Sequence, residues 1–135
     1  MIGDDIVQCL NCQAPIANKK KYCNNECQKE YEYKMYIKDW KNNRKSGIRG
    51  DYQTSLHIKR YLMEKYNNKC AKCSWGEVNI YTNKIPLEIE HIDGNYKNNS
   101  EENLILLCPN CHSLTATYKG ANRNNGRKQR KKYNG

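Results

Sequence analysis

The sequence contains no phenylalanine and only two tryptophans, and apolar residues make up 37% of its 135 positions. Eleven tyrosines must therefore supply most of the large apolar surface. No stretch approaches the ~20 consecutive apolar residues that a bilayer-spanning helix requires. We therefore expect no membrane partner, and one compact domain with a small satellite module rather than two large cores.

We also expect no secretory leader, because residues 1–8 carry two acids and no apolar run. We expect an intracellular, cytoplasmic protein. In a reducing compartment, closely spaced cysteine pairs favour metal thiolates over disulfides. A secreted disulfide protein is the alternative. All eight cysteines fall into such pairs: Cys9/Cys12, Cys23/Cys27, Cys70/Cys73 and Cys108/Cys111.

The spacing of these pairs indicates two structural Zn²⁺ sites. Residues 9–27 read C-x2-C-x10-C-x3-C, which is typical of a small finger with four sulfur ligands. The other two pairs are each C-x2-C and are separated by 34 residues. Chelation by these four thiolates would close the intervening chain into a loop and stabilise a small domain.

Acidic residues are absent after Glu102, although the whole chain has a net charge of +10. Excess positive charge attracts polyanions, and nucleic acid is the expected partner because each neutralised phosphate releases condensed counterions. A solvated, solubilising tail is the alternative for the C-terminal residues. The residues expected to contact DNA lie in or beside a basic linker at 42–54 and in the tail: Lys41, Arg44, Lys45, Arg49, Lys119, Arg123, Arg127, Lys128 and Arg130.

Apolar periodicity predicts two helices before residue 70. In the first helix, apolar residues recur every three or four positions and therefore share one face. The second helix begins after Thr54 or Ser55, either of which could cap it. His57, in the first turn of the second helix, is interpreted as structural or surface. The expected buried faces are Tyr33, Tyr36, Ile37 and Trp40 in the first helix, and Ile58, Tyr61, Leu62 and Tyr66 in the second.

After Cys70 the pattern changes to short strand-like segments separated by polar turns, which predicts an α+β fold. The expected strands are Val78–Tyr81, Leu87–Ile92 and Leu104–Leu107. Pro109 is well placed in the first turn of a final helix, which we expect to run through Tyr118.

The order of polar residues between the last two cysteine pairs is the most informative feature. Glu90 and His91 end one expected strand, Asn103 begins the next, and His112 follows the last cysteine. His91 and Asn103 are twelve positions apart, and Asn103 and His112 are nine apart. This order and spacing resembles the HNH nuclease family, also called ββα-metal nucleases.

The resemblance extends over about two-thirds of the chain, from about Trp40 to Arg130, and looks like phage and prophage HNH endonucleases that carry HIDG and CPNCH signatures. The four-cysteine segment at 9–27 resembles a finger often found ahead of such nucleases. The resemblance implies a zinc-stabilised ββα-metal core with connecting helices, and hydrolysis of double-stranded DNA with the core helix against the minor groove.

The chemistry expected of these residues follows from their types. His91 can act as the general base, because a neutral imidazole takes a proton from water near physiological pH. Glu90 and His112 offer an oxygen and a nitrogen to one divalent ion, Mg²⁺ first, with Mn²⁺ or Ni²⁺ as alternatives. The family resemblance implies that Asn103 takes no direct part in the reaction. Its side chain instead ties the loop that orients the general base.

One position departs from the family, in which Asp or His usually precedes the general base, whereas this chain has Glu90. Asp93 is a possible substitute ligand, and a catalytically inactive copy is an alternative. His112 can alternatively be read as a zinc ligand and His91 as a packed core residue. An isolated Asn match carries little weight among nineteen asparagines.

The sequence therefore predicts four segments and one principal function. The main alternative to a DNA endonuclease is a non-catalytic zinc-finger DNA-binding protein, such as a regulator or a phage packaging accessory. A module that binds or cleaves RNA is a third reading, and a monomer or a dimer is compatible with the sequence. The segments are a finger at 1–30, a helical basic connecting region at 31–69, the HNH core at 70–119, and a basic tail at 120–135.

Overall fold

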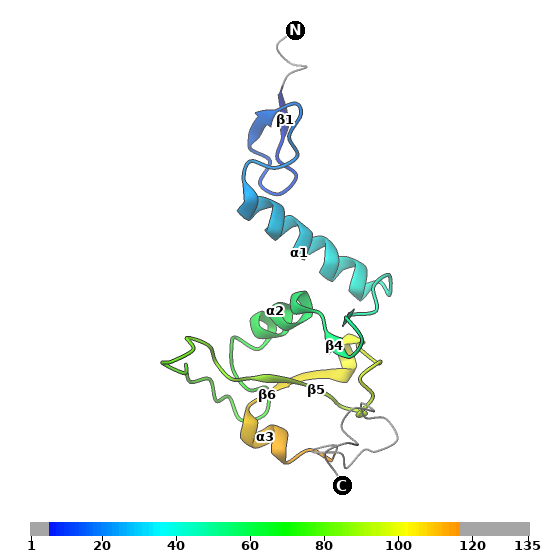
Figure 1. Cartoon of the computed structure of the whole chain (residues 1–135), viewed down its shortest axis with the longest axis vertical. Coiled ribbons are helices and arrows are strands. Elements are labelled where there is room, and N and C mark those ends of the chain that lie inside the picture. The colour runs from blue at the N-terminus through cyan, green and yellow to red at the C-terminus, as the bar shows by residue number, and fades with distance from the viewer. Residues whose placement is uncertain (1–5, 117–135) are drawn as a thin grey trace.

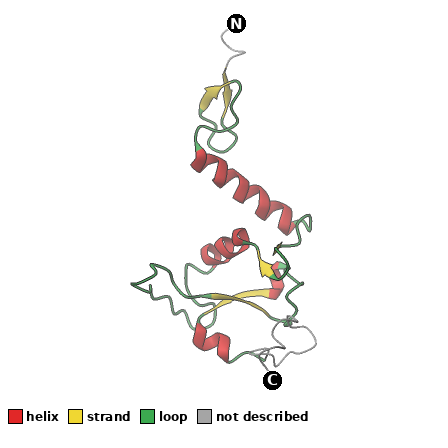
Figure 2. Ribbon diagram, in the orientation of Figure 1, coloured by secondary structure: helices red, strands yellow, loops and turns green. Residues whose placement is uncertain are grey.

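The computed structural model describes residues 6–116 and combines short strands with three α-helices, which confirms the α+β class. Three two-stranded antiparallel sheets are present in this region. Figures 1 and 2 show the finger at one end, joined by α1 to a body that contains the other elements. The elements are β1 (Ile6–Gln8), β2 (Pro15–Ala17), α1 (Asn25–Lys41), β3 (Ile48–Arg49), β4 (Gln53–Thr54), α2 (Leu56–Lys65), β5 (Glu88–His91), the 3-10 turn η2 (Glu101–Asn103), β6 (Leu104–Leu107) and α3 (Pro109–Ser113).

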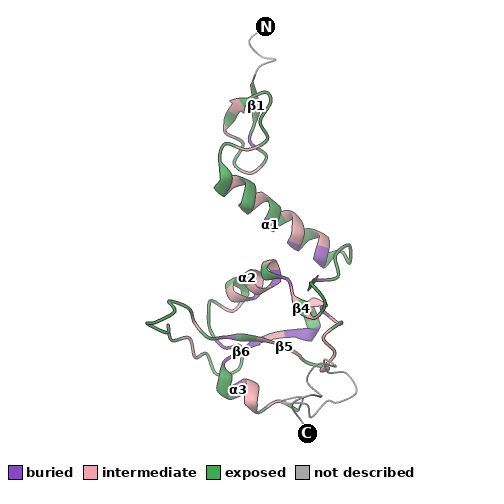
Figure 3. Cartoon of the chain, viewed as in Figure 1, coloured by how far each residue is buried: buried purple, intermediate pink, exposed green. Residues whose placement is uncertain are grey.

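Helix α1 begins where the Asn24 side chain accepts a 2.8 Å hydrogen bond from the backbone N–H of Cys27. Its buried residues, Tyr33, Ile37 and Trp40, form the apolar face that the sequence predicts. They lie in the half of α1 nearer the body, where the ribbon is coloured as buried in Figure 3. The finger end of α1 is mostly exposed.

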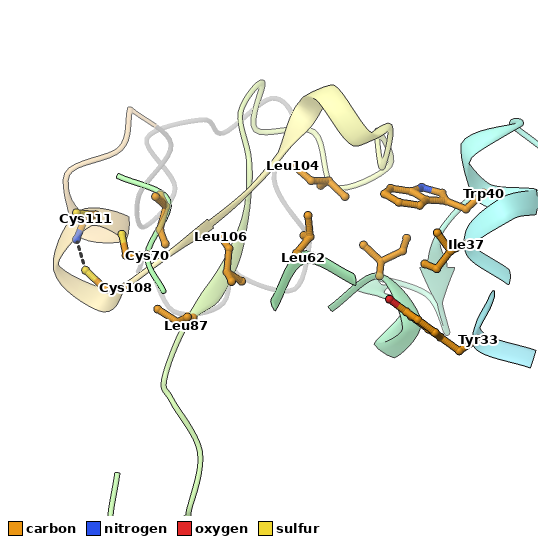
Figure 4. Close-up of a cluster of buried hydrophobic side chains, with 12 residues drawn as sticks. Tyr33, Ile37, Trp40, Leu62, Cys70, Leu87, Leu104, Leu106, Cys108 and Cys111 are labelled. Atoms are coloured by element: carbon orange, nitrogen blue, oxygen red, sulfur yellow. Dashed lines mark hydrogen bonds between the residues drawn. The ribbon is translucent and has the colours of Figure 1, made fainter. Parts of the chain in front are cut away.

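Helix α2 is capped by Ser55, whose hydroxyl accepts from the N–H of His57 at 3.1 Å. Ile58 and Leu62 on this helix are fully buried. They belong to one hydrophobic cluster with residues from α1 and from the β5–β6 hairpin (Figure 4). The region at 31–69 therefore packs into the same core as the segment from residue 70 onward.

The hairpin of β5 and β6 aligns Glu90 with Ile105 and His91 with Leu104. Since side chains alternate along a strand, His91 and Leu104 share one face and Glu90 and Ile105 the other. Leu104 and Leu106 face the core with α2. Helix α3 follows β6 and contacts both strands of this hairpin.

Two sequence-based predictions of secondary structure are wrong. The segment Val78–Tyr81 is not a strand: it makes only one isolated bridge, from Asn79 to Lys84. Ile80 and Tyr81 are 78% and 90% exposed, so no buried face holds an extended conformation. Helix α3 ends at Ser113 rather than continuing through Tyr118, which lies outside the described residues; the next side chain, Leu114, is 71% exposed and has no packing to extend the helix.

The expected linker at 42–54 contains an unpredicted hairpin, β3–β4, in which Ile48 pairs with Thr54. Gly47 enters this hairpin at φ +83°, a conformation that favours glycine. The basic tail at 120–135 lies outside the described residues. Among residues 6–116, no helix combines the length and apolar content needed to cross a bilayer.

Two leucines of α2 provide a matched test of the shared core. Leu62 is fully buried, whereas Leu56 is 62% exposed. We expect Leu62→Ala to lower the free energy of unfolding by about 2–5 kcal/mol, because it removes core contacts and leaves a cavity. Leu56→Ala should change it by less than about 0.5 kcal/mol. Urea denaturation followed by circular dichroism measures both, and equal effects would contradict the assigned packing.

Candidate active site and metal centres

The first four-cysteine group lies where the β1–β2 hairpin meets the start of α1. Its sulfur atoms all lie within 4.8 Å of one another. The Sγ of Cys23 lies 3.7 Å from that of Cys12 and 3.4 Å from that of Cys27. A tetrahedral zinc site with Zn–S bonds of about 2.3 Å places its sulfurs ~3.8 Å apart. The four thiols therefore have the donor type and spacing that such an ion requires.

The second group joins the turn at Cys70 and Cys73 to the start of α3. Here too the four ligand atoms lie within 4.8 Å of one another, and the Sγ atoms of Cys73 and Cys108 are 3.7 Å apart. The Cys108 sulfur also accepts a bond from the N–H of Cys111 at the beginning of α3. A cation bound here would fasten α3 to the start of the domain.

Backbone amides favour one thiolate in each group. Burial acts to raise the pKa of the Cys70 thiol, but the N–H groups of Cys108, Cys73 and Lys72 outweigh it and lower this pKa to about 6. The pKa of Cys9 in the first group also falls to about 6, again because amide hydrogen bonds outweigh burial. An ionised sulfur is the form that binds metal.

Glu90 and His112 meet between β5 and α3. The Oε2 atom of Glu90 lies 2.6 Å from Nδ1 of His112, and Glu90 is only 7% exposed. On the other side of the ring, Oε2 of Glu88 lies 3.4 Å from Nε2 of His112. The histidine is therefore placed between two carboxylates of β5. The second cysteine group has four sulfurs and does not include this histidine.

The Glu90–His112 pair has the donors that a hard or borderline divalent ion prefers, one carboxylate oxygen and one imidazole nitrogen. Ligands at 2.1 Å on adjacent octahedral positions are about 3.0 Å apart. The two atoms at 2.6 Å thus need to separate by only a few tenths of an ångström. These residues fit a metal that keeps several water ligands.

The imidazole of His91 forms a hydrogen bond with Asn99, a residue that the sequence analysis did not single out. Its Nε2 atom lies 2.7 Å from Oδ1 of Asn99. Asn99 is 4% exposed, and its backbone carbonyl accepts a 2.6 Å bond from the indole N–H of Trp40 in α1. Sequence reasoning missed Asn99, since it lies in an asparagine-rich loop and no local pattern distinguishes it from its neighbours.

Asn103 ties the loop between β5 and β6. Its Nδ2 donates to Oδ1 of Asp93 at 2.9 Å and to the carbonyl of Asn98 at 2.8 Å. Its Oδ1 accepts from the backbone N–H of Asp93 at 3.0 Å. The Asn98 side chain and the Asn95 N–H also donate to the Asp93 carboxylate, and these bonds lower its pKa. Asp93, the possible substitute ligand, is thus engaged in loop hydrogen bonds.

Glu90 and His91 leave β5 on opposite faces, because consecutive strand residues alternate. Within residues 6–116, β5 is paired with β6 alone, so its other edge has no strand partner. A groove of about 1620 Å³ runs beside β5 and is lined by His91, Arg49 and Lys59 among others. A phosphate can face both His91 and the Glu90–His112 pair only from the edge or end of β5.

The basic residues expected to bind DNA are partly engaged in the protein. The Nζ atom of Lys41 lies 4.5 Å from the Tyr61 ring centre, and that of Lys45 lies 5.9 Å from the Tyr36 ring centre. Arg44 is exposed, and Arg49 lines the groove beside His91. The other five expected contacts lie outside the described residues: Lys119, Arg123, Arg127, Lys128 and Arg130.

The third histidine of the chain has a packing role, as expected from the sequence. The His57 ring lies 4.8 Å from that of Tyr36 and 5.9 Å from that of Tyr33. It therefore helps to join α1 to α2.

Comparison with known proteins agrees with this geometry. The family model of the HNH endonucleases matches residues 70–115, which include β5, β6 and α3. Residues 70–115 are therefore similar to an HNH endonuclease domain, which agrees with the resemblance seen in the sequence. It is 53% identical over 55 residues to the H-N-H endonuclease F-TflIV of Escherichia phage T5. The aligned part is 41% of this chain and 23% of that protein, so the chain spans about a quarter of its relative's length. No solved structure matches.

The two sulfur clusters predict the metal content of the purified protein. We expect two zinc ions per chain by elemental analysis, because each group offers four thiols at tetrahedral spacing. Cys12→Ser and Cys73→Ser each change one exposed ligand, one in each cluster, and should each leave about one ion. A metal-free wild-type chain with oxidised cysteines would contradict this assignment.

Proposed function

We propose that this chain is a metal-dependent endonuclease that hydrolyses phosphodiester bonds in double-stranded DNA. The observation that carries the proposal is the meeting of Glu90 and His112 at 2.6 Å across β5 and α3, with His91 as the next residue of the strand, inside an HNH domain. The phage relative is named an endonuclease, which supports nucleic-acid cleavage as the reaction class.

In the proposed reaction, His91 accepts a proton from the attacking water, because imidazole titrates near neutral pH. Glu90 and His112 hold a divalent ion, most simply Mg²⁺, with Mn²⁺ and Ni²⁺ as alternatives. When bound, such an ion supplies positive charge to the phosphate oxygens and to the departing 3′ oxygen. Asn103 keeps the β5–β6 loop closed so that His91 remains at the end of β5.

The cysteine groups act in this proposal as structural zinc sites. Their thiols are placed 3.4 to 3.7 Å apart, as in a metal-thiolate site and too far for disulfide bonds. Zinc thiolates are typical of reducing compartments, so we also propose a cytoplasmic location. The basic groups along the linker and tail hold flanking phosphates, and the core helix faces the minor groove.

The three histidines of the chain permit a matched test of catalysis. With supercoiled plasmid and Mg²⁺, we expect the wild type to produce nicked DNA and chelation by EDTA to stop it. His91→Ala should reduce the rate by about 10²–10⁴-fold, because the general base is lost. His112→Ala should also be strongly impaired, because it removes one ligand of the ion. His57→Ala serves as the control and should retain cleavage.

DNA binding is measured together with cleavage, because this distinguishes an endonuclease from a protein that binds DNA without cutting it. A wild type that binds plasmid DNA tightly but never nicks it with Mg²⁺, Mn²⁺ or Ni²⁺ would exclude the proposed activity. A preference for single-stranded RNA in competition with duplex DNA would exclude the proposed substrate. Equal impairment of His57→Ala and His91→Ala, with loss of helical circular dichroism, would attribute the effect to folding.

Arg49 tests the path of the DNA, because its side chain is exposed and lines the groove beside His91. We expect Arg49→Gln to weaken duplex binding. The plot of the logarithm of the DNA association constant against the logarithm of salt concentration should become less steep by about 0.9, because one fewer counterion is released. The matched control is Arg60→Gln, which removes the same charge from a guanidinium held by Glu30 and Glu64. Fluorescence anisotropy over a salt series gives both slopes, and identical slopes for Arg49→Gln and wild type would place the DNA elsewhere.

A further inference from the structure

We infer that Asn99 is a positioning residue that fixes the tautomer of His91, with the proton on Nε2 and with Nδ1 as the atom that takes the proton of water. The inference deepens the proposed function and rests on it for the role of Nδ1. The fixed tautomer itself is a property of the protein without substrate, and is measured separately from cleavage.

The orientation of the Asn99 amide follows from its partners. Its Nδ2 lies 3.3 Å from the backbone carbonyl of Tyr96, and a carbonyl can only accept a hydrogen bond. The amide nitrogen must therefore be on the Tyr96 side. This places Oδ1 next to His91 at 2.7 Å and also within 3.4 Å of the Thr54 hydroxyl, which donates to it.

The amide orientation determines the state of the imidazole. Oδ1 of an amide has no hydrogen and can only accept, so Nε2 of His91 must donate. In a neutral imidazole one nitrogen carries the proton and the other holds a lone pair. Nδ1 of His91 is consequently the basic nitrogen, and a rotation of the Asn99 amide would reverse this preference, because the amide nitrogen would then donate to Nε2.

Three segments that precede residue 70 hold Asn99 in place. Trp40 of α1 donates its indole N–H to the Asn99 carbonyl at 2.6 Å, and Thr54 of β4 reaches the side chain. Gly47 passes so close that a Cβ there would lie 2.9 Å from the Asn99 Cβ and 2.7 Å from Cδ1 of Ile58 in α2. A buried polar side chain with this many partners has little freedom to turn.

Through these contacts the region before residue 70 helps to orient His91. Trp40, Gly47 and Thr54 all lie outside the segment that matches the HNH family, yet each touches the residue that contacts His91. The linker between α1 and α2 is therefore part of the support of the active site, in addition to any contact with DNA.

The tautomer is read directly by nitrogen-15 NMR of the metal-loaded protein at alkaline pH, where a neutral imidazole carries one proton. The His91 signals are identified by their loss in His91→Ala. We expect a protonated Nε2 and a bare Nδ1 in the wild type. In Asn99→Leu the His91 signals should shift to a mixture of tautomers, whereas those of His57 should not change. A protonated Nδ1 in the wild type, or an unchanged His91 in Asn99→Leu, would overturn the inference.

Kinetics give a second readout with a conservative variant. Asn99→Leu should lower kcat for plasmid nicking by about 10²-fold with little change in KM, since a misaimed base affects the chemical step. Asn99→Asp keeps an oxygen acceptor for Nε2 and should recover most of the lost rate. An Asn99→Leu enzyme as fast as the wild type, or an Asn99→Asp enzyme no faster than Asn99→Leu, would contradict the positioning role.

Trp40→Phe tests the same inference if the Asn99→Leu protein does not fold. This variant keeps an aromatic ring in the core but removes the indole N–H that binds the Asn99 carbonyl. We expect partial tautomer mixing and a smaller loss of kcat, and a Trp40→Phe protein identical to the wild type in both measurements would count against the inference. If the wild type shows the expected tautomer but nicks no DNA, the positioning contact stands and the proposed catalytic function fails.

Discussion

The clustering of Cys70, Cys73, Cys108 and Cys111 is the constraint on which the candidate site depends. Helix α3 has five residues, far fewer than the ~12–15 that an isolated helix needs in water. Two of these cysteines are in its first turn or cap it, and the adjacent His112 is the residue that faces Glu90. A cation held by the four sulfurs would therefore position the histidine for a second ion, and the two proposed metal sites would be linked through one turn of helix.

The other half of the site is positioned by packing instead of metal ligation. Leu104 and Leu106 of β6 share a hydrophobic cluster with α1 and α2, which brings Trp40 against the loop that precedes β6. His91 lies on this side of the hairpin and Glu90 on the opposite side. The hairpin thus separates His91, the proposed base, from the Glu90–His112 pair, and one phosphate could face both only from the edge or end of β5.

Local rules in the sequence predicted the features that depend on neighbouring residues. The Ser55 cap, the buried stripe of α1 and the cysteine spacing all follow from periodicity or from short-range chemistry. The strand expected at 78–81 failed because its apolar residues find no partner surface. Asn99 was missed because its importance arises from Trp40 and His91, which are 59 and 8 positions away, and no local pattern contains that information.

Two asparagines support His91, the proposed general base, and its loop. Asn103 uses both ends of its amide to close the loop through Asp93 and Asn98. Asn99 uses both ends of its amide to contact Tyr96 and His91. An amide suits both positions because it offers a donor and an acceptor on one rigid group without a charge that would compete for the metal. The polar loop between β5 and β6 is in this way part of the candidate site, since its hydrogen bond to Nε2 of His91 leaves Nδ1 as the nitrogen that would accept a proton.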